Sequence, residues 1–208
     1  MVKIKICGIT NYEDAQMACA LGADAIGFIF YPSSPRYIPP AAASKIINKL
    51  PPFVTKVGVF VNMRLSEVEE LVVTLNLNLV QLHGEESPEY CSRLAFPCLK
   101  AVRLQKEFDL AQLSRFRTAG FLLDTFDNQR LGGTGKTFDW SLARRAVGYG
   151  PIVLAGGLTA ENVAQAIQTA EPYGVDVCSG VEAAPGKKDA QKLGLFFEEI
   201  RKYEQNHK

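Results

Sequence analysis

The stretch Val2-Lys3-Ile4-Lys5-Ile6-Cys7-Gly8-Ile9-Thr10 decides the fold of this chain. Its β-branched residues predict a short strand over residues 2–6. Gly8 interrupts the run before a helical pattern begins at about residue 11. The sequence therefore brings the Cys7 thiol to the end of a strand, where it is either a small core residue or a proton-transfer group.

The same order, a short apolar run followed by an amphipathic segment, recurs eight times along the 208 residues. The predicted strands are 2–6, 25–30, 54–60, 79–82, 98–102, 121–123, 151–154 and 175–177. The predicted helices are 11–21, 41–50, 65–75, 88–94, 108–116, 140–147, 160–170 and about 189–203. The strands are mostly apolar on both faces, as parallel strands covered by helices are.

Eight such units predict one (β/α)₈ barrel domain over residues 1–208. An open doubly wound sheet is the main rival, but it usually carries Gly-x-Gly-x-x-Gly after its first strand, and Cys7-Gly8-Ile9-Thr10 does not fit that pattern.

Composition narrows the function. The chain is 47% hydrophobic and 22% charged, which is typical of one globular domain. Its formal net charge of +1 argues against a nucleic-acid surface built on bulk positive charge. No apolar run approaches the ~20 residues of a membrane span, and Lys3 and Lys5 interrupt the only apolar stretch near the start, so we expect neither a membrane span nor a signal peptide.

The five cysteines are an odd number and lack Cys-x-x-Cys or Cys/His metal spacing. We therefore expect reduced thiols in a cytoplasmic protein and no metal site. The sequence is compatible with either a monomer or a homodimer.

In a barrel of this kind the active site lies at the carboxyl ends of the strands, so the polar residues that follow each apolar run are the candidates. They are Cys7, Arg36, Asn62, Gln81, His83, Arg103, Asp124, Gly156, Gly157, Asp176, Ser179 and Gly180.

The seventh and eighth loops predict an anion site. Gly156 and Gly157 permit backbone N–H groups to approach a ligand closely, and Ser179-Gly180-Val181-Glu182 has the capping spacing of a short extra helix. Barrels often hold a phosphate between these loops. The alternative is that the glycines only end their strands.

Three side chains have a functional and a structural interpretation. Asp124 follows an apolar strand, where its protonated form is favoured and suits a general acid, or else it caps a helix or forms an ion pair. Arg36 either grips a ligand carboxylate with two parallel hydrogen bonds or forms a surface ion pair. His83 either orients a substrate or is simply hydrogen-bonded at the strand end.

The glycine-rich loop at 132–137 superficially resembles a phosphate-binding Walker A loop, but Arg130 occupies the position where that motif requires glycine. A lid over the active site and an inert connection are both open interpretations of it.

Taken together, these residues resemble the phosphoribosylanthranilate isomerase family of tryptophan biosynthesis. The resemblance lies in residues 5–10, 22–28, 34–38, 81–84, 123–124, 133–140, 155–158 and 179–182, in one order over nearly the whole chain. Residues 127–131 are the least family-like stretch.

The resemblance implies a (β/α)₈ isomerase that uses no cofactor and acts on a small phosphorylated substrate by an Amadori rearrangement. It further implies that Cys7 is the general base, Asp124 the general acid and Arg36 the ligand of the anthranilate carboxylate. The amides around Gly156, Gly157, Ser179 and Gly180 would hold the phosphate, and His83 would contact the substrate.

Two alternatives remain at this point. One is another phosphosugar barrel, an epimerase or a lyase, for which Lys100 is the candidate Schiff-base lysine. The other is a non-catalytic phosphate-binding barrel, in which Cys7 is only a core residue.

Overall fold

A computed structural model describes residues 1–104, 108–125 and 140–207. In these residues eight parallel strands pair in chain order and close into a barrel, which confirms the predicted fold class. The strands are β1 (Lys3–Ile6), β2 (Ala25–Ile29), β3 (Thr55–Phe60), β4 (Leu79–Leu82), β5 (Cys98–Leu104), β6 (Gly120–Thr125), β7 (Ile152–Leu154) and β8 (Gly174–Val177). Ile6 pairs with Ile26 on one side and with Val177 on the other, which closes the sheet.

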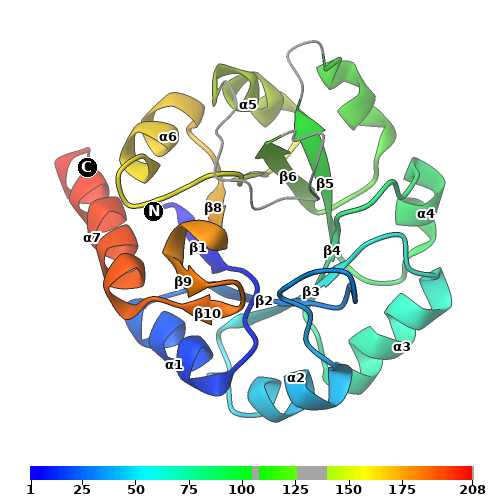
Figure 1. The fold of residues 1–208 in the computed structure, drawn as a ribbon. Helices are drawn as coiled ribbons and strands as arrows, with labels where there is room; N and C mark the ends of the chain where they lie inside the picture. Colours follow the sequence, from blue (N-terminus) through cyan, green and yellow to red (C-terminus); the bar gives the residue numbers. More distant parts are fainter. Residues whose placement is uncertain (105–107, 126–139, 208) are drawn as a thin grey trace.

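Helices form a ring around the strands, and the last helix lies beside the first (Figure 1). They are α1 (Tyr12–Leu21), α2 (Pro40–Ile47), α3 (Leu65–Leu75), α4 (Pro88–Arg93), α5 (Trp140–Ala146), α6 (Val163–Ala170) and α7 (Ala190–Asn206). No helix in this part of the chain is long and apolar enough to cross a membrane.

Three local predictions were wrong. The helix predicted over 108–116 is a 3₁₀ helix at Leu110–Arg115, whose first turn is capped by the Asp109 carboxylate through the Ala111 N–H. The capping-box spacing of Thr10 and Glu13 predicts Thr10 as the cap of helix α1, but Asn11 is the cap. The Thr10 hydroxyl donates instead to the carbonyl of Gly186.

The third correction concerns Glu182, which caps no helix. After β8 the chain makes a 3₁₀ turn (Ser179–Val181) and then a short hairpin of β9 (Glu182–Ala184) and β10 (Lys187–Lys188). The carboxylate of Glu182 turns to Arg36 and Lys188, which are cationic donors and therefore stronger partners than a backbone N–H.

The alternation of side chains along each strand decides which residues reach the inside of the barrel. In β6, Phe121 and Leu123 pack against the helices, whereas Leu122 belongs to a separate cluster with Leu99 and Val153. Asp124 lies two residues after Leu122 and therefore shares the inner face. By the same period, Lys5 and Cys7 face inward, because Ile4 and Ile6 pack outward.

Candidate active site

One pocket lies at the carboxyl ends of the strands, and all eight residues to which the family resemblance gives a role line it. These residues are Cys7, Arg36, His83, Asp124, Gly156, Gly157, Ser179 and Gly180. Of the other sequence candidates, Gln81 and Asp176 line the same pocket, as does Cys178, whereas Asn62 and Arg103 do not. Residues that lie up to 173 positions apart in the chain thus meet at one end of the barrel, as parallel strands in chain order require.

Cys7 follows β1 and is only 5% exposed. Its N–H donates to the Val177 carbonyl over 2.9 Å, which brings it beside Cys178. Gly27 leaves room for the Cys7 side chain, since a Cβ at Gly27 would lie 2.9 Å from Cys7 Sγ and 3.1 Å from Lys5 Nζ. Hydrogen bonding with Cys178 lowers the pKa of Cys7 well below its ordinary value; burial opposes this shift, and the charge of Lys5 adds to it. The pocket therefore favours the thiolate of Cys7.

Cys178 is the protonated partner of this thiol pair. Hydrogen bonding with Cys7 and burial raise the pKa of Cys178 well above its ordinary value. Its Sγ also lies 3.7 Å from Glu182 Oε1, to which the thiol donates. Cys178 therefore stays protonated beside Cys7, and its single S–H can turn either to Cys7 or to Glu182.

A buried ion pair lies beneath the thiols. Lys5 Nζ and Asp176 Oδ1 are 2.8 Å apart, and both side chains are less than a tenth exposed. Burial raises the pKa of Asp176 to about 6, although the charge of Lys5 opposes the shift. Burial alone would lower the pKa of Lys5, but Asp176 and Cys7 raise it above its ordinary value. Lys5 is therefore a permanent cation close to Cys7.

Asp124 lies in β6 and faces His83, which follows β4. Asp124 Oδ2 is 3.2 Å from His83 Nε2, although the imidazole N–H is not aligned for a hydrogen bond. The Gln81 amide nitrogen donates to His83 Nδ1 over 2.9 Å, so the imidazole proton lies on Nε2 and faces Asp124. The Gln81 Oε1 atom is buried and has no hydrogen-bond partner among the described residues.

Arg36 lies in the loop between β2 and α2. Its Nε is 3.0 Å from both carboxylate oxygens of Glu182, and its Nη2 donates to Oε2 over 2.7 Å. Within the described part of the chain, Nη1 donates no hydrogen bond. Gly8 lies beneath the arginine, where a Cβ would be 3.0 Å from Arg36 Cδ. One edge of the guanidinium group is thus fixed, and the other remains available.

The loops after β7 and β8 present unpaired backbone donors. Gly156 and Gly157 have φ angles of 82° and 65°, which only glycine adopts readily. Across the described residues, the N–H groups of Gly156, Gly157, Ser179 and Gly180 donate to no acceptor. The Asn162 side chain fixes the first loop by accepting from Thr159 N and donating to the Gly157 carbonyl. Such a group of converging N–H donors is suited to an anion.

Lys100 does not reach this pocket. Its Nζ is 2.7 Å from Glu86 Oε2 and 2.6 Å from the Gly84 carbonyl, so the ammonium group is buried and paired. In residues 1–104, 108–125 and 140–207, no three His, Cys, Asp or Glu side chains gather in a way that could hold a metal ion. The glycine-rich loop at 132–137, interpreted as a lid or an inert connection, lies outside the described residues.

Sequence reasoning did not assign a role in the site to Lys5, Cys178, Glu182 or Lys188. A signal existed for Lys5, since a lysine at an inward position of a parallel strand needs a buried partner. For Lys188 no signal was available, because its partner Glu182 becomes its neighbour only through the β9–β10 hairpin.

Comparison with known proteins identifies similar chains. A family model described as N-(5'phosphoribosyl)anthranilate (PRA) isomerase matches residues 4–199. The N-(5'-phosphoribosyl)anthranilate isomerase of Citrifermentans bemidjiense is 52% identical over 202 residues, which cover 97% of this chain and 98% of that one.

Two solved structures are similar along nearly their whole length. A phosphoribosyl anthranilate isomerase in complex with reduced 1-(o-carboxyphenylamino)-1-deoxyribulose 5-phosphate has a TM-score of 0.88 and 44% identity, and the match covers 97% of this chain and 100% of that one. Monomers generated from the dimeric enzyme of Thermotoga maritima have a TM-score of 0.87 and 43% identity, with the same coverage.

Proposed function

The chain belongs to the N-(5'-phosphoribosyl)anthranilate isomerase family of tryptophan biosynthesis, and from this premise we propose that Cys7 is its general base and Asp124 its general acid. The enzyme converts N-(5'-phosphoribosyl)anthranilate into 1-(o-carboxyphenylamino)-1-deoxyribulose 5-phosphate. The observation that best supports the two roles is that both side chains line one pocket although Cys7 follows β1 and Asp124 lies in β6.

Ring opening is the step assigned to Asp124. The protonated carboxyl donates to the ring oxygen of the aminofuranose, the C1–O bond breaks, and the nitrogen lone pair forms a protonated Schiff base. His83 Nε2 lies 3.2 Å from the Asp124 carboxyl, and the Gln81 amide contacts the other ring nitrogen of His83, so these two side chains are placed to orient the acid.

Proton abstraction is the step assigned to Cys7. The Schiff base acidifies the proton on C2, the thiolate removes it, and the resulting enamine tautomerises to the ketose. Cys7 suits this role because the pocket lowers its pKa, which favours the thiolate that removes the proton. An acid and a base positioned in this way each typically contribute about 10²–10⁴-fold.

Binding is assigned to the rest of the pocket wall. The free edge of Arg36 meets the anthranilate carboxylate, and the N–H groups of Gly156, Gly157, Ser179 and Gly180 meet the phosphate. His83 contacts the substrate beside Asp124, and the unpaired Oε1 of Gln81 accepts from a sugar hydroxyl.

The decisive experiment supplies phosphoribosylanthranilate to the purified protein in the presence of EDTA and follows the ketose product by NMR. We expect turnover that is insensitive to EDTA. Treatment with borohydride during turnover tests the lyase alternative, since a Schiff-base lysine would be trapped as a mass increase on Lys100. Binding of the substrate without any product would instead support the non-catalytic barrel.

We also propose that the enzyme works in the cytoplasm as a homodimer. A reducing compartment keeps the neighbouring Cys7 and Cys178 thiols from forming a disulfide. Phe53, between α2 and β3, is 99% exposed and lines a cavity at the amino-terminal end of the barrel, with Lys3 and Tyr173. Light scattering of the wild-type protein and of Phe53→Glu tests this assembly, and a monomeric wild-type protein would contradict it.

A further inference from the structure

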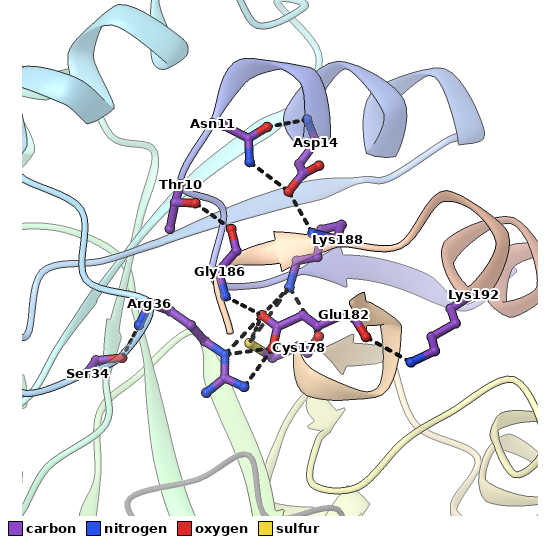
Figure 2. Close-up of polar contacts among 10 residues, drawn as sticks. All are labelled: Thr10, Asn11, Asp14, Ser34, Arg36, Cys178, Glu182, Gly186, Lys188 and Lys192. Carbon is purple, nitrogen blue, oxygen red and sulfur yellow. Dashed lines mark hydrogen bonds and ion pairs between the residues drawn. The ribbon is translucent and has the colours of Figure 1, made fainter. Parts of the chain in front are cut away.

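Glu182 occupies the centre of a cluster of polar side chains beside the pocket (Figure 2). Its carboxylate accepts from Arg36, from Lys188 Nζ over 3.0 Å, from the Gly186 N–H over 3.3 Å and from the Cys178 thiol over 3.7 Å. Burial alone would raise the pKa of Glu182, but the hydrogen bonds from Arg36 and the charge of Lys188 lower it. Glu182 is therefore an ionised carboxylate shared between two cations.

The two cations differ in their access to the pocket. The Lys188 side chain is completely buried and does not line the pocket. Its backbone N–H donates to Asp14 over 2.7 Å and its Nζ to the Cys178 carbonyl over 3.1 Å, so the hairpin and α1 hold it in place. Arg36 lines the pocket and keeps Nη1 unbonded in the described part of the chain. Arg36, Glu182 and Lys188 together thus carry one excess positive charge, and of the two cations only Arg36 lines the pocket.

We propose that Glu182 and Lys188 are positioning residues for Arg36 and thereby determine the preference of the pocket for an aromatic substrate that carries a carboxylate. Glu182 fixes the guanidinium group through Nε and Nη2, so that the Nη1 edge faces the ligand. Lys188 offsets the charge of Glu182, so that Glu182 does not fully neutralise the positive charge of Arg36. The inference rests on the proposed role of Arg36.

Orientation and charge can be separated by substitution. The double variant Glu182→Gln/Lys188→Met removes one negative and one positive charge, so the net charge of the cluster is unchanged while the ionic hold on Arg36 is lost. Lys188→Met alone keeps the contact between Arg36 and Glu182 but removes the excess positive charge. Lys192→Met is the matched control, because Lys192 Nζ donates to the backbone carbonyl of Glu182 and not to its carboxylate.

The experiment compares two inhibitors, the reduced product analogue and its aniline counterpart, which lacks only the carboxylate. The quantity measured is the inhibition constant of the aniline counterpart divided by that of the reduced product analogue. KM and kcat for the natural substrate are measured beside it. We expect the ratio to fall by about tenfold in both variants, because the double variant lets the guanidinium group turn away from the carboxylate and Lys188→Met lets Glu182 neutralise it, so each weakens a charge-assisted pair. The aniline ligand should bind all variants alike, and Lys192→Met should behave as wild type.

The outcomes separate this inference from the proposed role of Arg36. If Arg36→Met leaves the ratio unchanged, the carboxylate is held elsewhere and the role of Arg36 is wrong. If Arg36→Met lowers the ratio and the double variant does not, Glu182 and Lys188 do not position Arg36. An equal loss for both inhibitors would indicate a merely structural role and overturn the inference. If the double variant does not fold, Glu182→Asp decides, because it keeps every charge but withdraws the carboxylate from Arg36.

Discussion

Replacing Lys5 with methionine should raise the pKa of the Cys7 thiol. Sγ of Cys7 and Nζ of Lys5 each lie about 3 Å from the same point above Gly27, so they are no more than about 6 Å apart. At that separation two unit charges interact by roughly 3 kcal/mol with an effective dielectric constant near 20, which corresponds to roughly two pKa units. Asp176 cancels part of the charge of Lys5, so we expect a rise of about one unit.

The sign of the effect fixes the pH range in which it appears. Because the thiol pKa is lowered, the acid limb of kcat/KM should lie below the ordinary value for cysteine. Removing Lys5 moves that limb to higher pH. Activity should therefore fall most on the acid side of the profile and recover as the pH rises.

The assay is the pH dependence of Cys7 alkylation by iodoacetamide, quantified on the Cys7 peptide by mass spectrometry, beside the pH profile of kcat/KM. The variant Lys5→Met/Asp176→Asn is the matched control, because it leaves no unpaired carboxyl in the barrel interior. If the pKa of Cys7 in both variants lies within a few tenths of a unit of the wild-type value, the charge of Lys5 does not stabilise the thiolate.

Four further substitutions test the assigned roles. Cys7→Ser should lower kcat by about 10²–10⁴-fold with little change in KM, and wild-type turnover would exclude Cys7 as the base. Asp124→Asn should lower kcat by a similar factor, and retained activity above neutral pH would contradict a general-acid role. Arg36→Met should raise KM for the substrate by about tenfold or more, because a charge-assisted pair is lost, and an unchanged KM would place the carboxylate elsewhere. Cys178→Ala should raise the alkylation pKa of Cys7 more than Cys178→Ser, which keeps a donor, and equal effects would show that the hydrogen bond is unimportant.

The barrel and the pocket wall could be predicted because both depend on short-range periodicity. Asp124 follows Leu122 by two residues and so inherits its inward direction, and Cys7 is related to Lys5 in the same way. Parallel strands in chain order then bring their carboxyl ends together, independently of the conformations of the loops. No knowledge of individual contacts was needed to place these side chains in one pocket.

The partners of the site residues could not be predicted, because they depend on the paths of loops. Arg36 and Glu182 are 146 residues apart, and their contact requires both the loop after β2 and the hairpin after β8. The spacing of Ser179 and Glu182 predicted a capping interaction. This prediction failed because the local pattern carries no information about a guanidinium group from another loop.

The distribution of cations explains how a thiolate can persist in a pocket built for anions. A substrate that carries a phosphate and a carboxylate brings negative charge close to Cys7, and that charge alone would raise the thiol pKa. In the arrangement that we propose, backbone N–H groups would meet the phosphate and Arg36 would meet the carboxylate, so each anion would have its own donors. Lys5 is close to the Cys7 thiol and is less than a tenth exposed, so the ligand cannot screen it. The substrate therefore does not reach this cation, and we expect the pKa of Cys7 to stay lowered when the pocket is filled.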